Sequence, residues 1–152
     1  KEIINDSGIF ICLDPKQNNF SIYKGAHIIT PNHHEVQRAA GMEITGANGI
    51  QKLSEAVLKK YSFPAMLVTR GEEGMSLFEN GRKIVHTYFP TQAKEVYDVT
   101  GAGDTVIGIL ALCLAARANM KEATSLANLS AGIVVGKVGT AIVSRKELIE
   151  AL

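Results

Sequence analysis

The chain of 152 residues has no tryptophan, only two cysteines and four prolines, and a formal net charge of +1. This near-neutral balance, without a dense lysine and arginine stripe, argues against a nucleic-acid surface. No apolar run reaches the roughly 20 residues that a membrane-spanning helix needs. Cys12 and Cys113 lie in apolar runs far apart, so we expect buried free thiols rather than a disulfide or a metal site. These absences predict a cytoplasmic protein that binds neither nucleic acid nor membrane.

The remaining composition is ordinary for a globular protein, with 46% hydrophobic and 20% charged residues. The length predicts one domain with a sizeable core, and no linker, repeat or low-complexity tract divides it. The first residue is Lys1 rather than methionine, and no secretory signal is visible. We therefore expect the chain to be a fragment or a processed protein.

Apolar runs alternate with helical patterns along the first half of the chain. Three continuous apolar runs, closed by a proline or a polar loop, predict buried parallel strands over 8–15, 26–31 and 65–69. Alternation on both sides of Asn80-Gly81-Arg82 predicts an antiparallel hairpin over 75–79 and 83–88. Helical spacing predicts helices over 32–40, 48–61, 102–118, 121–138 and 145–152. We expect an α/β fold with a mostly parallel sheet, helices on both faces and an antiparallel edge hairpin.

The string Asp98-Val99-Thr100-Gly101-Ala102-Gly103-Asp104 directly precedes an apolar helical pattern. Glycine lets successive backbone N–H groups point at one spot, and the start of a helix adds partial positive charge there. The string thus predicts a site for phosphoryl oxygens, with Asp104 placed to take a proton from a nearby hydroxyl. An anion hole and a carboxylate base are what phosphoryl transfer to an alcohol requires. A plain glycine turn with Asp104 as the helix cap is the alternative.

Three more polar clusters follow predicted strands, where open α/β sheets bind their ligands. Lys16, after Asp14-Pro15, has the charge to bind a phosphate but also suits a solvated turn. Asn32 and Glu35 are three residues apart on one helix face and suit a hydrated Mg²⁺, or else a capping box. The segment 69–74, with its two glycines, permits close approach of a nucleotide or forms a plain turn before the hairpin.

Small residues recur in the last third of the chain. Asn128 and the stretch 131–140 suit the wall of an adenine pocket, or merely close helix packing. The adjacent His33 and His34 point in different directions on a helix and do not favour a shared metal. We expect His27 and His86, inside predicted strands, to be packed or surface residues rather than catalysts.

The strings Asp-x-Thr-Gly-Ala-Gly-Asp, Asn-x-x-Glu and Thr-x-Gly-x-x-Gly together resemble the ribokinase (PfkB-type) carbohydrate kinases. Further strings resemble the heptose-7-phosphate kinase domain of the bacterial ADP-heptose pathway: Asp14-Pro15-Lys16, Tyr23-Lys24-Gly25-Ala26, Thr30-Pro31-Asn32 and residues 131–141. The resemblance covers essentially the whole chain. It implies a ribokinase-like fold and transfer of the γ-phosphoryl group of ATP to the anomeric hydroxyl of heptose 7-phosphate, for lipopolysaccharide precursor synthesis. Another carbohydrate or nucleoside kinase, or a non-catalytic nucleotide-binding fragment, is the alternative.

The resemblance also implies roles for individual residues. It makes Asp104 the base, and it forms the anion hole from Gly101, Ala102 and Gly103. It implies that Asn32 and Glu35 arrange Mg²⁺ through water, and that Asp98 lies at a monovalent cation (K⁺) site. With the strand-end positions, it predicts these nucleotide-binding residues: Lys16, Asn32, Glu35, Thr69, Gly71, Gly74 and Asn128.

The sequence departs from that family by lacking the N-terminal half, which holds most sugar contacts and the lid. It also lacks a His-x-Gly-His nucleotidyltransferase motif. We therefore expect residues 1–152 to be the C-terminal, nucleotide-binding half of a kinase domain, inactive or nearly so in isolation. An exposed sheet edge and apolar surface then favour a homo-oligomer.

Overall fold

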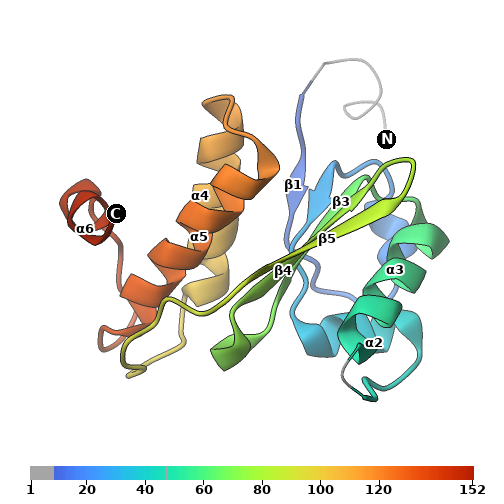
Figure 1. The fold of residues 1–152 in the computed structure, drawn as a ribbon, viewed down its shortest axis with the longest axis horizontal. Coiled ribbons are helices and arrows are strands. Elements are labelled where there is room, and N and C mark those ends of the chain that lie inside the picture. Colours follow the sequence, from blue (N-terminus) through green and yellow to red (C-terminus); the bar gives the residue numbers. More distant parts are fainter. Residues whose placement is uncertain (1–8, 47) are drawn as a thin grey trace. The chain divides into compact units, whose positions relative to one another are not determined.

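The computed structural model describes residues 9–46 and 48–152 (Figure 1). Gly8, the first residue of the first predicted strand, lies outside the described residues. The chain divides into two compact units, each described by itself below. The first unit contains the residues up to Arg70 together with Ser76–Thr87, and the second contains Gly71–Met75 and Tyr88–Leu152. Within the described residues, no helix is both long enough and apolar enough to cross a membrane.

The sheet has five strands in the order β1-β2-β3-β4-β5. Its first three strands are parallel: β1 (Cys12–Leu13), β2 (Ile28–Ile29) and β3 (Ala65–Thr69). β3 has the predicted bounds, whereas β1 and β2 are much shorter than the apolar runs that contain them. Pro15 and Pro31 follow these two strands and carry no backbone N–H to extend a ladder.

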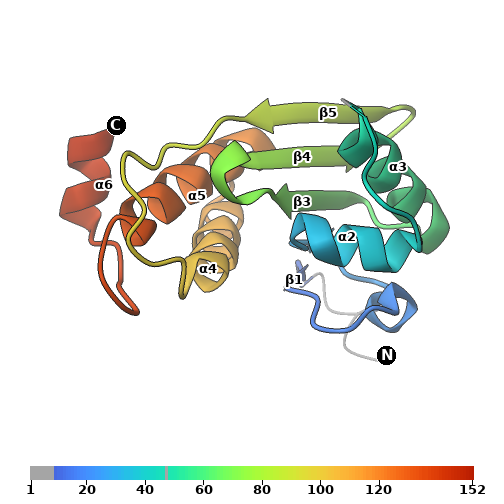
Figure 2. The same ribbon diagram turned by 90° about the horizontal axis from the view of Figure 1, so that it is seen from below.

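The last two strands, β4 (Met75–Asn80) and β5 (Ile84–Phe89), form the predicted antiparallel hairpin. Figure 2 shows the arrowheads of β3, β4 and β5 pointing in alternate directions. The Asn80 N–H donates to Pro64 O at 2.7 Å, which joins the end of β4 to the start of β3. The expected edge hairpin is therefore confirmed.

Helices α2 (His33–Ala40) and α3 (Gly49–Tyr61) lie on one face of this sheet (Figure 1). Gly41, with φ +70°, ends α2 where the sequence predicts. A 3₁₀ helix that the sequence did not predict, η1 (Phe20–Tyr23), follows β1. Fully buried side chains form the core of this unit: Phe20, Ile29, Val36, Val57, Leu58, Met66, Val68 and Phe78.

The second unit is mainly helical. It contains the short 3₁₀ helix η2 (Gly71–Glu73) and three α-helices: α4 (Ala102–Ala115), α5 (Met120–Val135) and α6 (Arg145–Ala151). α4 and α5 lie side by side (Figure 1). α4 ends three residues earlier than predicted because Arg117 takes a left-handed φ of +68°. Ser144 caps α6 as predicted, through a reciprocal bond pair with Glu147.

Both cysteines are free thiols, as expected. Cys12 and Cys113 are half-buried rather than buried, because β1 lies at the edge of the sheet and Cys113 lies on a partly exposed face of α4. This partial burial raises the pKa of each thiol above its ordinary value.

His86 on β5 belongs to a hydrogen-bonded cluster inside the first unit. Its Nε2 lies 3.0 Å from Ser76 Oγ, and its ring stacks on Phe78 at 4.4 Å between centroids. Ser76 is fully buried and its Oγ accepts a hydrogen bond from Arg70 Nη1 at 3.2 Å. Ser76 Oγ therefore links His86 to Arg70 through hydrogen bonds inside this unit. His86 thus packs inside this unit, which is one of the two roles that the sequence left open.

Stability should fall at acidic pH because of His86. Burial and, secondarily, the charge of Arg70 lower the pKa of His86, while the carboxylate of Glu55 opposes this shift. The fold thus favours neutral His86, and the stabilisation is lost as pH falls from about 6.5 through the lower folded-state pKa. Urea unfolding at pH 8, 7, 6 and 5 should show a smaller fall for His86→Gln than for the native chain. A difference between the two proteins that is the same at pH 8 and pH 5 would contradict this assignment.

Candidate functional site

The carboxyl ends of β1, β2 and β3 lie side by side in the first unit. The Thr30 N–H donates to Leu13 O at 2.9 Å, which joins the end of β2 to the end of β1. The Thr69 N–H donates to Pro31 O at 3.0 Å, and Asn32 forms an isolated parallel bridge with Thr69. The structure therefore brings Asn32, which follows β2, next to Thr69, the last residue of β3, at the edge where open α/β sheets bind ligands.

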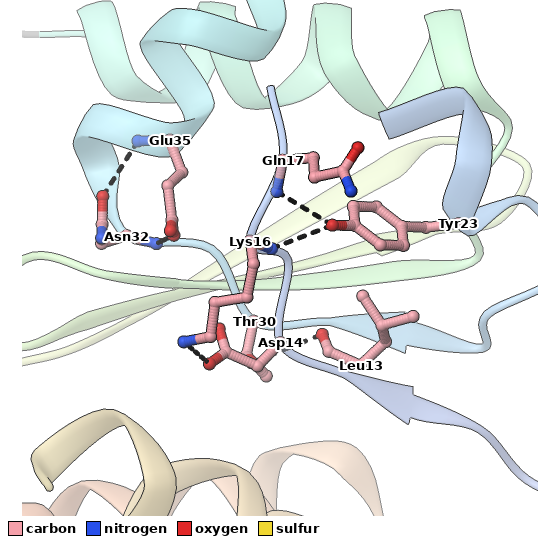
Figure 3. Close-up of polar contacts among 8 residues, drawn as sticks. All are labelled: Leu13, Asp14, Lys16, Gln17, Tyr23, Thr30, Asn32 and Glu35. Carbon is pink, nitrogen blue, oxygen red and sulfur yellow. Dashed lines mark hydrogen bonds and ion pairs between the residues drawn. The ribbon is translucent and has the colours of Figure 1, made fainter. Parts of the chain in front are cut away.

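Asn32 and Glu35 form a capping box at the start of α2 (Figure 3). The Glu35 N–H donates to Asn32 Oδ1 at 2.9 Å, and the Asn32 N–H donates to Glu35 Oε2 at 2.7 Å. The capping box, which the sequence left open as the alternative to a Mg²⁺ site, is thus present. It leaves the second carboxylate oxygen of this half-buried Glu35 available to a further donor.

The loop after β1 carries Lys16, and a tyrosine organises it. Lys16 Nζ forms an ion pair with Asp14 Oδ2 at 2.5 Å. Tyr23, the last residue of η1, accepts hydrogen bonds at its hydroxyl from the backbone N–H groups of Lys16 and Gln17 (Figure 3). The sequence predicts a role for Lys16, whereas Tyr23 stands out only as part of the family string Tyr23-Lys24-Gly25-Ala26. A tyrosine seven residues beyond the lysine follows no local pattern that would have identified it.

The glycine string of the second unit starts α4 as expected. Gly101 is the N-terminal cap with φ +83°, and its carbonyl accepts from Thr105 N–H at 2.9 Å and from the Thr105 hydroxyl at 3.0 Å. Asp104 is the third residue of α4, is exposed, and does not cap the helix. The alternative role as a cap is therefore not observed. The Ala102 N–H donates to Val99 O at 3.2 Å. The other first-turn N–H groups have no acceptor within the helix, so this end of α4 can receive an anion.

Asp98 closes the turn before Gly101. Its Oδ1 accepts the Thr100 N–H at 2.8 Å. This bond, the Thr100 hydroxyl and the Gly139 N–H hold the pKa of Asp98 below its ordinary value. The N–H groups of Tyr97 and Asp98 donate to Val135 O, at the end of α5, at 2.8 and 3.3 Å. The carboxylate is thus ionised on a loop fixed to α5.

Internal packing explains two of the predicted nucleotide-binding residues, Gly74 and Asn128, whereas a third, Gly71, has room for a ligand. A Cβ on Gly74 would lie 2.2 Å from Phe89 O, so this glycine admits the chain's own backbone. Asn128 is buried and its Nδ2 donates to Pro90 O at 2.7 Å, which ties α5 to the segment after β5. Gly71 has φ +60° and open space around it, and is the position of the three where a ligand has room.

The first unit has parallel strands that end in polar loops, and in the second unit α4 begins at a glycine and carries an exposed aspartate. Each feature is typical of α/β proteins that bind anionic ligands. The pattern of the pfkB family carbohydrate kinases matches residues 8–147, and the chain belongs to that family. The family expected from the sequence strings is thus confirmed, and the fold is ribokinase-like.

Individual relatives agree with this assignment. The bifunctional protein HldE of Nitrosococcus oceani is 52% identical over 145 residues, which are 95% of this chain and 30% of that protein. The ribokinase of Arabidopsis thaliana, solved with ribose and ATP, superposes with a TM-score of 0.81 at 25% identity, over 95% of this chain and 47% of that one. The phosphofructokinase-2 of Escherichia coli, solved with potassium, gives a TM-score of 0.85 at 17% identity, over 99% and 50%. The chain thus spans about a third of its curated relatives and about half of these structures.

Proposed function

We propose that this chain is the nucleotide-binding half of an ATP-dependent sugar kinase, whose acceptor is the anomeric hydroxyl of heptose 7-phosphate. The proposal rests on membership of the pfkB family over residues 8–147. In the structure, Asp104 is exposed in the first turn of α4, directly after the cap residue Gly101. The 52% identity with HldE supports the heptose acceptor, which the sequence strings also favour.

In this proposal Asp104 takes the proton from the attacking hydroxyl. The backbone N–H groups of Gly101, Ala102 and Gly103 stabilise the charge on the transferred phosphoryl group. Lys16 contributes a point charge to the nucleotide phosphates, and Thr69 and Gly71 line the nucleotide at the end of β3. Asn128 lies beside the small residues of 131–140, which form the wall of the adenine site in this proposal. Its amide donates to Pro90 O and so holds this part of α5 in place.

The residues around Asn32 fit a hydrated Mg²⁺. Among the described residues, no group of three histidine, cysteine or acidic side chains is placed to hold a metal ion directly. Mg²⁺ keeps several of its waters, so the free oxygen of Glu35 and the Asn32 side chain suit contact through water. When bound, the ion would neutralise charge on the phosphates. The ionised Asp98 and its loop carbonyls suit a monovalent cation such as K⁺.

Titration calorimetry with Mg·ATP tests this proposal on the native chain and on Asp104→Asn. Both proteins should bind, and Asp104→Asn should bind equally or more tightly because a negative charge near the phosphates is removed. Neither should turn over ATP with sugar at a kinase rate, because the chain spans only 47% of the ribokinase that was solved with ribose and ATP.

Glu122→Gln is the matched control, since Glu122 is the third residue of α5 as Asp104 is of α4. Its affinity for Mg·ATP should equal that of the native chain. Absence of nucleotide binding in the native protein would reject the proposal. Fast sugar-dependent turnover would instead reject the expected inactivity of the isolated chain. The homo-oligomer stays a prediction that light scattering can check.

A further inference from the structure

One side-chain hydroxyl holds the backbone of the loop that carries Lys16. The N–H groups of Lys16 and Gln17 each lie 2.9 Å from the Tyr23 oxygen. Figure 3 shows both bonds converging on this atom. The preceding residue, Pro15, has a fixed φ, so the backbone is also restrained directly before the two hydrogen-bonded residues. Tyr23 thus determines where the chain turns after β1.

The Tyr23 ring is itself fixed by the core. It lies at the end of η1, and its centroid is 6.0 Å from that of Phe20 in an edge-on arrangement. Phe20 is fully buried, and Asn19 caps η1 by accepting the Ser21 N–H at 3.1 Å. A tyrosine has only two side-chain torsions to restrain. The rigid core therefore extends through Tyr23 to an exposed loop.

This arrangement restricts the conformational freedom of Lys16. Its side chain is 74% exposed, and its ammonium pairs with Asp14, whose side chain is 20% exposed. A lysine on a free loop loses much rotamer and backbone freedom when it binds an anion. A fixed backbone and a neighbouring carboxylate restrict that freedom beforehand, which reduces the entropic cost of binding.

We infer that Tyr23 is a positioning residue for phosphate binding. By accepting the Lys16 and Gln17 N–H groups, it places the Lys16 ammonium at the carboxyl ends of β1 and β2, where it meets the phosphates of a nucleotide. This inference rests on the proposed function and adds a residue that acts through Lys16 without touching the nucleotide.

Tyr23→Phe tests the inference, because it removes the hydroxyl and keeps the ring. The Kd of Mg·ATP, measured by calorimetry on the full chain, should rise about fivefold, whereas the Kd of adenosine should not change. Tyr61→Phe is the matched control. Tyr61 packs at 5.8 Å from the same Phe20, and its hydroxyl donates to Ala39 O on α2, away from the Lys16 loop. This variant should leave both Kd values unchanged.

A double-mutant cycle with Lys16→Ala separates positioning from general loosening of the fold. Once Lys16 is removed, Tyr23→Phe should add no further loss of Mg·ATP affinity. Equal loss in both backgrounds, or equal loss for adenosine and Mg·ATP, would overturn the inference. Unchanged Mg·ATP affinity in Tyr23→Phe would overturn it alone and leave the proposed function standing. A native chain that binds no Mg·ATP would overturn both.

Discussion

Gly74→Ala should lower the free energy of unfolding by about 3 kcal/mol or more. Two costs combine at this position. Gly74 has φ +82°, and a side chain in the left-handed region costs roughly 1–2 kcal/mol. A Cβ would also lie 2.2 Å from Phe89 O and 2.5 Å from Thr91 N, which are backbone atoms that cannot rotate away. Overpacking of this kind costs roughly a further 1–3 kcal/mol.

Gly71→Ala is the matched control for this prediction. Gly71 belongs to the same loop and has φ +60°, but no atom lies within 4 Å of the position that its Cβ would take. Only the conformational cost applies, so the loss should be about 1 kcal/mol. Urea unfolding of the three proteins measures both values. Equal losses at the two glycines would show that the approach of Phe89 O does not constrain Gly74.

Phe20→Ala should cost about 3–5 kcal/mol of stability, because it empties the centre of the first unit's core. Phe20 is fully buried and contacts three other rings: Tyr23 at 6.0 Å, Tyr61 at 5.8 Å and Phe63 at 6.4 Å between centroids. These rings cannot all move to fill the space. The same change should release Tyr23 and, with it, the Lys16 loop.

Thermal and urea unfolding measure this loss, and Phe10→Ala is the control. Phe10 is 47% exposed and stacks on His27, so its removal should cost about 1 kcal/mol or less. Phe20→Leu should fall between the native chain and Phe20→Ala. A loss in Phe20→Ala no larger than in Phe10→Ala would refute the central role of Phe20.

The elements predicted well are those that local chemistry defines. α2 begins after Asn32 and ends at Gly41, because a capping box and a left-handed glycine are read within a few residues. β3 matches its apolar run because it is buried along nearly its whole length. The sequence predicts longer strands for β1 and β2 than the structure has. The prediction is wrong because the extent of a ladder depends on partners that are distant in sequence. η1 was missed because four residues show no period.

The candidate site divides in the same way. The sequence predicted the residue types at the strand ends and at the start of α4, and the structure places them there. It did not predict what holds them. Asn128 bonds to Pro90, 38 residues earlier, Gly74 admits the backbone of Phe89, and Tyr23 reaches back to Lys16. Such contacts follow from the packing of distant segments, which no local spacing encodes.

The reciprocal bonds between Asn32 and Glu35 also decide how a metal role can be examined. Glu35→Ala would remove a charge and a helix cap at once, so weaker binding of Mg·ATP could not be attributed to either. Glutamine is nearly isosteric and keeps a carbonyl oxygen for the Asn32 N–H, as capping boxes allow. Glu35→Gln therefore removes the negative charge and keeps the capping box, so the effect of the charge can be measured separately from the effect on the fold.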